Sequence, residues 1–270
     1  FNAGNYSISY VDGELTVTPA ALTISANNAT KSYGQTASLT YSSSGLQNSE
    51  TIGSVDLSSA GSAVTANVAG SPYAIVASNA TGGTFNAGNY SISYVDGELT
   101  VTPAALTISA NNATKSYGQT ASLTYSSSGL QNSETIGSVD LSSAGSAATA
   151  NVAGSPYAIV ASNATGGTFN AGNYSISYVD GELTVTPAAL TISANNATKS
   201  YGQTASLTYS SSGLQNSETI GSVDLSSAGS AVTANVAGSP YAIVASNATG
   251  GTFNAGNYSI SYVDGELTVT

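Results

Sequence analysis

The sequence contains no cysteine, methionine, tryptophan, histidine or arginine, and only 6% of its residues are charged. Without cysteine, the chain can form no disulfide bond and no cysteine-ligated metal site. Without histidine, it lacks the side chain that most often acts as a general base near neutral pH. No pair of carboxylates recurs at catalytic spacing either. We therefore expect that the chain is not an enzyme and that it has no catalytic residue, cofactor or metal site.

The few charges are mostly negative, with three lysines against 14 acidic residues and a net charge of −11. Nucleic-acid binding needs clustered lysine and arginine, and anionic lipids attract the same cations. No stretch approaches the ~20 apolar residues that cross a bilayer. We expect no nucleic-acid partner and no membrane insertion of this segment. A weakly charged, hydroxyl-rich and acidic surface is typical of secreted proteins.

Repetition dominates the sequence. The segment FNAGNYSISYVDGELTVT begins at four positions, each 84 residues after the last: Phe1, Phe85, Phe169 and Phe253. Aligned at this period, the copies differ at a single position, which holds Val64, Ala148 and Val232. Such a period indicates tandem domains that pack mainly on their neighbours. The neighbouring repeats of the same chain are therefore the first expected partners.

Proline marks the expected boundaries between repeats. Pro19, Pro103 and Pro187 each follow the sequence ELTVT, and proline tends to lie where strands begin or end because it cannot donate to a β-ladder. The boundaries predict three repeats, residues 19–102, 103–186 and 187–270. Residues 1–18 are then expected to be the C-terminal hairpin of a preceding repeat, which makes the chain a piece of a longer array.

The strongest local pattern is Asp12-Gly13 between two runs of alternating apolar and polar residues. This dipeptide favours a two-residue turn, so the pattern predicts an antiparallel hairpin in which Tyr10 lies opposite Leu15. Tyr10 and Leu15 would share the buried face with Ile8 and Val17.

Further short strands are predicted in ALTISA from Ala21, SLTYSS from Ser38, AVTANVA from Ala63 and PYAIVAS from Pro72. Leu22 and Ile24 share one face of the first of these, and Val64 is expected to point inward in the third. Ala148 would then weaken the middle repeat by about 1–2 kcal/mol.

Many short strands separated by turn residues indicate an all-β fold, and we predict tandem small β-sandwich (Ig-like) domains in an elongated rod. The alternative is a β-grasp-like unit with one short helix, capped by Ser49, in SETIG.

Two groups of residues are candidate sites. Asp96 and Glu98, joined in space by Glu50 and Asp56, offer carboxylates to calcium, but they supply few of the six to eight oxygens that the ion needs. We favour a plain turn. Lys31 offers the amine for an isopeptide bond with asparagine, yet the spacing singles out no partner. A salt bridge or a charge that protects a strand edge is the preferred interpretation.

The motifs Lys31-Ser32-Tyr33-Gly34, Tyr73-Ala74-Ile75 and Asn5-Tyr6 through to Pro19, with their copies, resemble the MBG-type repeats that carry a Lys-x-Tyr-Gly signature. The resemblance covers every repeat. Members of that family occur in tandem in very large bacterial surface proteins, including filamentous-haemagglutinin-like adhesins, where they are thought to form stalks. The resemblance therefore implies an extracellular protein on a bacterial cell surface.

Two functions remain open from the sequence. The leading hypothesis is a structural stalk or fibre that projects a distal binding region. The alternative is an adhesive module whose repeat surface binds glycan, a host protein or other copies of itself.

Overall fold

The structure is a computed structural model that describes all 270 residues, and it divides into two compact units. Unit 1 holds Phe1–Ala105 together with two segments of the second repeat, Leu130–Glu134 and Asn170–Ser175. Unit 2 consists of Leu106–Gly129, Thr135–Phe169 and Ile176–Thr270. The first repeat thus lies in unit 1 and the third in unit 2.

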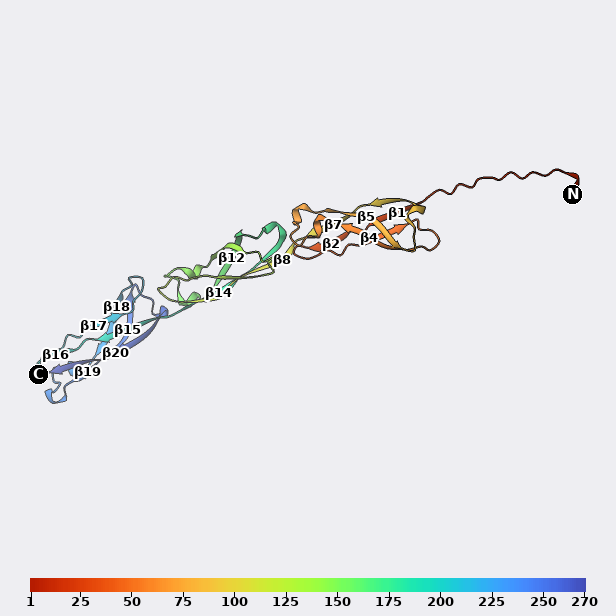
Figure 1. Ribbon diagram of the computed structural model, residues 1–270. Helices are drawn as coiled ribbons and strands as arrows, with labels where there is room; N and C mark the ends of the chain where they lie inside the picture. The colour runs from red at the N-terminus through yellow and green to blue at the C-terminus, as the bar shows by residue number, and fades with distance from the viewer. The chain divides into compact units, whose positions relative to one another are not determined.

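The first repeat contains seven strands: β1 (Ala20–Ala26), β2 (Ala29–Ser32), β3 (Tyr41–Ser44), β4 (Ile52–Ser58), β5 (Tyr73–Gly83), β6 (Tyr90–Val95) and β7 (Gly97–Thr102). They form a three-stranded sheet in the order β3-β1-β6 and a four-stranded sheet in the order β2-β7-β5-β4. Figure 1 labels β1, β2, β4, β5 and β7 of this repeat. Within these sheets, β1 runs parallel to β6 and β2 runs parallel to β7.

The other two repeats have the same two sheets. The strands of the second repeat are β8 (Ala104–Ala110), β9 (Ala113–Ser116), β10 (Tyr125–Ser128), β11 (Ile136–Ser142), β12 (Tyr157–Gly167), β13 (Tyr174–Val179) and β14 (Gly181–Thr186). Those of the third are β15 (Ala188–Ala194), β16 (Ala197–Lys199), β17 (Tyr209–Ser212), β18 (Ile220–Ser226), β19 (Tyr241–Gly251), β20 (Tyr258–Val263) and β21 (Gly265–Val269).

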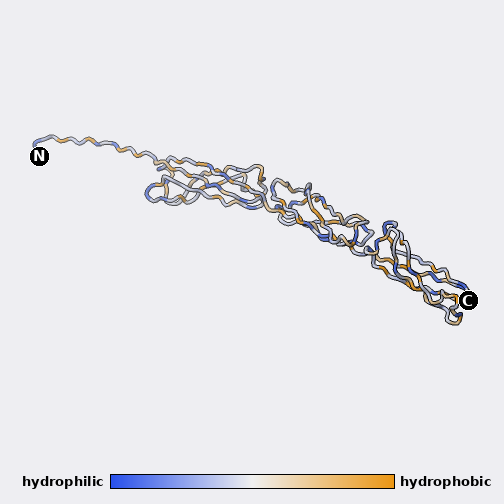
Figure 2. Tube along the Cα trace, turned by 180° about the vertical axis from the view of Figure 1, so that it is seen from behind, coloured by the Kyte–Doolittle hydropathy of each residue, from blue (hydrophilic) through white to orange (hydrophobic).

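The core of each repeat lies between its two sheets, so the predicted all-β sandwich is confirmed. In the first repeat, Leu22 and Ile24 of β1 are fully buried and pack with Ala80 of β5 and Tyr90 of β6. The colours of neighbouring residues alternate along many segments of the chain, as expected for strands with one buried face (Figure 2).

No α-helix is present, and the helical elements are 3-10 turns of three residues. They are η1 (Ala3–Asn5), η2 (Ala60–Ser62), η3 (Val68–Gly70), η4 (Ala87–Asn89), η5 (Ala144–Ser146), η6 (Val152–Gly154), η7 (Ala171–Asn173), η8 (Ala228–Ser230), η9 (Val236–Gly238) and η10 (Ala255–Asn257). None of them is long and apolar enough to cross a membrane. The helix expected in SETIG, and with it the β-grasp alternative, is wrong. No helical element follows Ser49, because β4 begins only three residues later, at Ile52.

The predicted Asp-Gly hairpin is also wrong. In the complete repeat, Asp96 separates β6 from β7, but these strands belong to different sheets. Neither Asp96 nor Gly97 has a positive φ, which the expected two-residue turn requires at both positions. The chain therefore crosses from one sheet to the other at this point.

Residues 1–18 form no hairpin. Apart from η1 they contain no regular element, and Tyr10, Leu15 and Val17 are exposed. The same sequence at residues 85–102 forms β6 and β7, each of which pairs with other strands of its repeat. A segment without those strands has nothing to pair with.

The single position at which the copies differ faces solvent. Val64 is 39% exposed and Val232 is 47% exposed, and both lie between two 3-10 turns and not in a strand. The strand predicted in AVTANVA is therefore wrong. Since Val64 and Val232 belong to none of the core clusters, the expected weakening of the middle repeat by Ala148 loses its basis.

Candidate functional site: the tyrosine junction between repeats

The Lys-Ser-Tyr-Gly motif closes β2 and turns the chain at the edge of the four-stranded sheet. Lys31 is buried, and its Nζ donates hydrogen bonds to the carbonyl oxygens of Ala63 and Gln35, the latter at 3.0 Å. Burial lowers the pKa of Lys31. The expected salt bridge and the isopeptide alternative are wrong, because two backbone carbonyls hold the ammonium group. Lys31 fixes the turn from inside. We call residues 31–34 and their copies 115–118 and 199–202 the tyrosine turn.

In unit 1 the tyrosine turn of the first repeat contacts residues of the second. The hydroxyl of Tyr33 donates to Oε1 of Glu134 at 2.6 Å, and the hydroxyl of Tyr174 donates to Oε2 of the same carboxylate. The two rings meet edge to face, with centroids 5.5 Å apart and planes at 77°. Tyr33 is only 3% exposed. One carboxylate thus joins two tyrosines from successive repeats.

An asparagine makes the second contact of this junction. Asn173 accepts a hydrogen bond from the backbone N–H of Val68 at 3.0 Å and donates one to Oδ1 of Asn67 at 2.8 Å. Val68 begins η3, and the side chain of Asn67 does not cap this turn. The next repeat therefore supplies the cap that satisfies an N–H at the start of the turn.

Unit 2 contains the same junction between the second and third repeats. The hydroxyl of Tyr117 donates to Oε1 of Glu218 at 2.5 Å, and its ring meets that of Tyr258 at 5.5 Å and 77°. Asn257 accepts from the N–H of Val152 at 3.0 Å. The geometry of the contact is therefore a property of the repeat sequence.

The glycine of the tyrosine turn is required for two separate reasons. Gly34 has a φ of 82°, a conformation that residues with a Cβ rarely adopt. A Cβ built at this position would also lie 2.4 Å from Oε1 of Gln131, a residue of the second repeat. Gly118 and Gln215 are related in the same way in unit 2. The Tyr-Gly pair is therefore the part of each repeat that touches its successor.

Comparison with protein families decides the identity. A family model described as MBG domain (YGX type) matches residues 22–100, 106–184 and 190–268. The chain belongs to the MBG domain (YGX type) family. The resemblance noted in the sequence is confirmed, and the Tyr-Gly pair of these MBG repeats is the junction residue pair described above.

Solved structures similar to these MBG repeats are tandem domains. They include the I9-I11 tandem of titin (13% identity, 92% of this chain and 99% of that chain, TM-score 0.24) and the four N-terminal Ig domains of Dscam1 isoform 9.44 (13%, 93% and 73%, TM-score 0.28). Three N-terminal domains of the Hoc capsid protein of bacteriophage RB49 also match (8%, 93% and 99%, TM-score 0.25). Similarities at this level carry no argument about function. A comparison with curated proteins finds no match.

The acidic residues of the MBG repeats do not gather into a metal site. Glu50 accepts a hydrogen bond from the hydroxyl of Tyr90, and Asp56 accepts one from Asn79 at 3.0 Å. No group of three or more acidic residues lies close enough to hold a metal ion. The backbone N–H of Glu98 donates to Asn28, so the Asp96–Glu98 segment packs as part of the sheet crossover.

Sequence reasoning missed the role of every junction residue. It assigned Lys31 to a salt bridge or to the protection of a strand edge, gave Tyr33 no partner and considered Glu50 only as a calcium ligand. The contact joins residues about one hundred positions apart, Tyr33 with Glu134, and no local spacing connects them. The signal that was available was the Tyr-Gly pair itself, recurring once in each repeat.

Raising the pH above 10 is expected to weaken both junctions. The pKa of Tyr174 is raised from 10.0 to about 12, mainly by burial and next by the hydrogen bond to Glu134. The pKa of Tyr258 is raised in the same way beside Glu218. A tyrosine whose pKa is higher in the folded state than in the unfolded state stabilises the fold, and it does so fully when the pH is below the unfolded-state pKa. This stabilisation is lost as the pH rises from 10 to 12.

Urea unfolding at about pH 8 and about pH 11 measures this loss. Tyr174→Phe with Tyr258→Phe removes two of the hydroxyls whose pKa is raised, and Tyr33, Tyr90 and Tyr117 keep theirs. The double variant should therefore lose less stability between the two pH values. An equal loss in both proteins would assign the alkaline sensitivity to other groups.

Proposed function

We propose that this chain is a structural segment of a bacterial cell-surface adhesin, an extracellular stalk or fibre that projects a distal binding region. The proposal assigns no catalysis to the repeats. The observation that supports it most is the tyrosine junction, which replaces a free linker between successive domains by a packed and hydrogen-bonded contact. A stalk requires this of its joints, because domains on free linkers would not hold a binding region away from the cell.

The linker itself supports the same function. Only Pro103 separates β7 from β8, and the backbone N–H of Tyr33 donates to the carbonyl of Thr102, the residue before that proline, at 2.9 Å. The chain leaving one repeat is thus bonded to the tyrosine turn that contacts the next. Proline restricts its own φ and the conformation of the residue before it, which limits bending at this point.

The exposed faces offer few groups for a specific ligand. Hydroxyl side chains of adjacent strands hydrogen-bond to one another, as Thr23 does with Ser93 and Ser54 with Thr81. These pairs recur in the later repeats. Hydroxyl groups that are already hydrogen-bonded to one another are less available to a ligand. This favours a stalk over the alternative of an adhesive repeat surface.

Electron microscopy of the full-length protein that carries this sequence tests the proposal. The expected image is a thin shaft of MBG repeats with a distinct domain at its tip. Small-angle scattering of the present chain should give a maximum dimension close to three repeats placed in line. A compact particle, or binding of glycans or host proteins along the repeats themselves, would contradict the stalk.

A further inference from the structure

A long pair of parallel strands runs through both sheets of the first repeat. β1 pairs with β6 over residues 20–25 and 90–95, and β2 pairs with β7 over residues 29–32 and 99–102. In both sheets each residue lies opposite the residue 70 positions later in the chain. The two strand pairs therefore share one register, although the chain changes sheets between them. We call residues 20–32 together with residues 90–102 the parallel ribbon.

A side-chain hydrogen bond continues the parallel ribbon across the sheet change. Only Asn27 and Asn28 separate β1 from β2, and only Asp96 separates β6 from β7. Oδ1 of Asn28 accepts a hydrogen bond from the backbone N–H of Glu98 at 2.8 Å, and these two residues are again 70 positions apart. The two segments are thus bonded to each other at the point where neither strand pair reaches.

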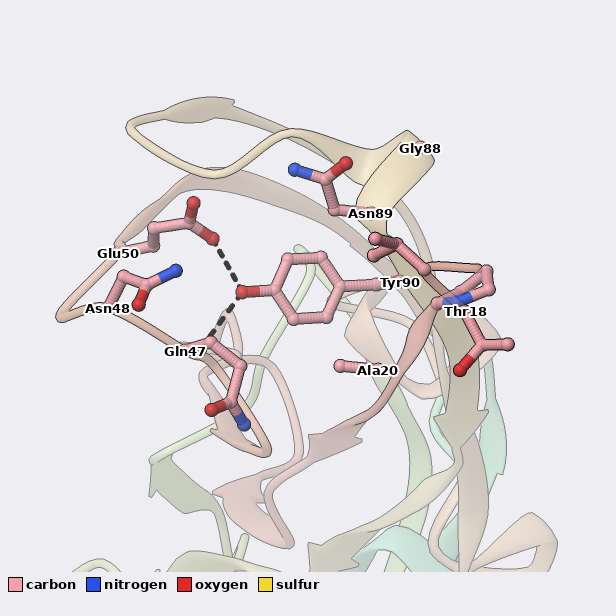
Figure 3. A pocket seen from close by; sticks show the side chains of 10 residues that line it. Thr18, Ala20, Gln47, Asn48, Glu50, Gly88, Asn89 and Tyr90 are labelled. Carbon is pink, nitrogen blue, oxygen red and sulfur yellow. Dashed lines mark hydrogen bonds between the residues drawn. The ribbon is translucent and has the colours of Figure 1, made fainter. Parts of the chain in front are cut away.

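Both ends of the parallel ribbon are held by hydrogen bonds. At one end Ala20 lies opposite Tyr90, and Figure 3 shows both residues, with the hydroxyl of Tyr90 bonded to Glu50. At the other end the backbone N–H of Tyr33 donates to the carbonyl of Thr102 at 2.9 Å. The ribbon is therefore bonded to its end and does not open from a loose one.

The parallel ribbon is repeated along the chain. In the third repeat, Ala188 lies opposite Tyr258 and Ala197 opposite Leu267, which keeps the same offset in both sheets. The bond that continues the ribbon across the sheet change also recurs, as N–H of Glu182 donates to Asn112 and N–H of Glu266 donates to Asn196, each at 2.8 Å. The ribbon is therefore encoded by the repeat sequence.

The chain enters the first repeat at one end of the parallel ribbon and leaves it at the other. Ala20 follows Pro19 and begins the first strand, and Thr102 precedes Pro103 and ends the last. Because the strands are parallel, they begin at the same end of the ribbon and finish together at the opposite end. Tension between the preceding and the following repeat therefore pulls the two segments in opposite directions along their own length.

We propose that each MBG repeat carries tension along the chain through the parallel ribbon, which resists the force in shear. The inference deepens the proposed stalk and rests on it for the direction of the load. In shear all residue pairs of the ribbon have to separate together, whereas in peeling they separate one after another. Forced unfolding is governed by the unfolding rate, so shear should require the higher force. Strands β3, β4 and β5 lie between the two segments in the sequence and receive load only after the ribbon has separated.

Optical-tweezers unfolding of the full-length chain in two directions tests the proposal. The chain has no cysteine, so two introduced cysteines define where it is held. Phe1→Cys with Thr100→Cys pulls the beginning of one segment against the end of the other, which is shear. Phe1→Cys with Ala87→Cys pulls both segments from the same end, because Ala87 lies just before β6, and this is peeling. All three positions are exposed, so both proteins should keep the fold.

The first repeat should require at least about twofold more force in shear than in peeling. In shear it should unfold in one step of about 250 Å, because the folded ribbon spans about 40 Å and residues 20–100 reach about 290 Å when extended. Equal forces in the two directions would overturn the inference. The proposed stalk is judged separately, since electron microscopy would still show a thin shaft in that case.

Asn28→Ala tests whether the parallel ribbon is continuous across the sheet change. It should lower the shear force and leave the peeling force unchanged, because peeling begins at Ala20 and reaches the sheet change last. Asn27→Ala is the matched control, since the side chain of Asn27 donates to Thr40, outside the ribbon, at 3.0 Å. It should leave the shear force unchanged. An equal fall of the shear force in both variants would overturn the continuous ribbon.

Discussion

Tyr117→Ala is expected to remove about 3 kcal/mol from the coupling between the second and third repeats. The substitution deletes a buried ring, its edge-to-face contact with Tyr258 and the hydrogen bond to Glu218. Hydrogen bonds to charged groups contribute about 1.5–3 kcal/mol, and an aromatic pair adds about 0.5–1.5 kcal/mol. The carboxylate of Glu218 keeps its bond to Tyr258, which limits the loss.

The matched control is Tyr201→Ala. Tyr201 has the same neighbours in sequence and the same turn, but it is 58% exposed. Its removal should cost less than about 0.5 kcal/mol, as for most surface substitutions. The two variants therefore separate the contribution of the junction from that of the turn.

Equilibrium unfolding in urea measures the difference. Stability of a repeat array is approximately the sum of terms for each repeat and for each interface, so loss of one interface should also broaden the transition. If Tyr117→Ala and Tyr201→Ala destabilise the chain equally, the tyrosine serves its own repeat and the junction does not couple its neighbours.

The elements that sequence predicted well are those in which alternation and burial coincide. Leu22 and Ile24 of β1 face the core as the pattern of ALTISA indicated, and Ile75 and Ala77 of β5 do so as well. In these strands one face packs on the opposite sheet, so every second residue is buried and apolar.

Alternation of apolar and polar residues did not predict a strand correctly in a segment whose conformation is fixed by backbone hydrogen bonds. In AVTANVA, Val64 lies beside the junction and its carbonyl accepts from Gly34 at 3.1 Å, so backbone position and not side-chain burial fixes this segment. The junction could not be predicted from one repeat at all, because its two halves lie in successive repeats. The family motif located it without revealing what the tyrosine contacts.

The hairpin predicted at the Asp-Gly dipeptide is wrong for a different reason, which the pairing of the strands explains. β1 and β6 run side by side in one sheet, and β2 and β7 run side by side in the other. Both connections therefore cross between the sheets at the same place. Gly97 lies at this crossover, and a Cβ there would be 2.6 Å from the carbonyl oxygen of Ala26 and 3.1 Å from the carbonyl carbon of Asn27. The glycine allows two backbones to approach closely.

Gly97→Ala should therefore destabilise the first repeat by about 2–3 kcal/mol, because the atoms that the new methyl group meets are backbone and cannot rotate away. This value already allows for a stabilisation of about 0.4–1 kcal/mol, which alanine provides because it lowers the conformational entropy of the unfolded chain. Gly13→Ala is the matched control, since it lies in the same Asp-Gly dipeptide with no atom within 4 Å of a built Cβ. Urea unfolding of both variants beside the unmodified chain gives the comparison. Equal stability of the three proteins would mean that β1 and β7 do not approach at the crossover, and that the glycine is conserved between repeats only by their common origin.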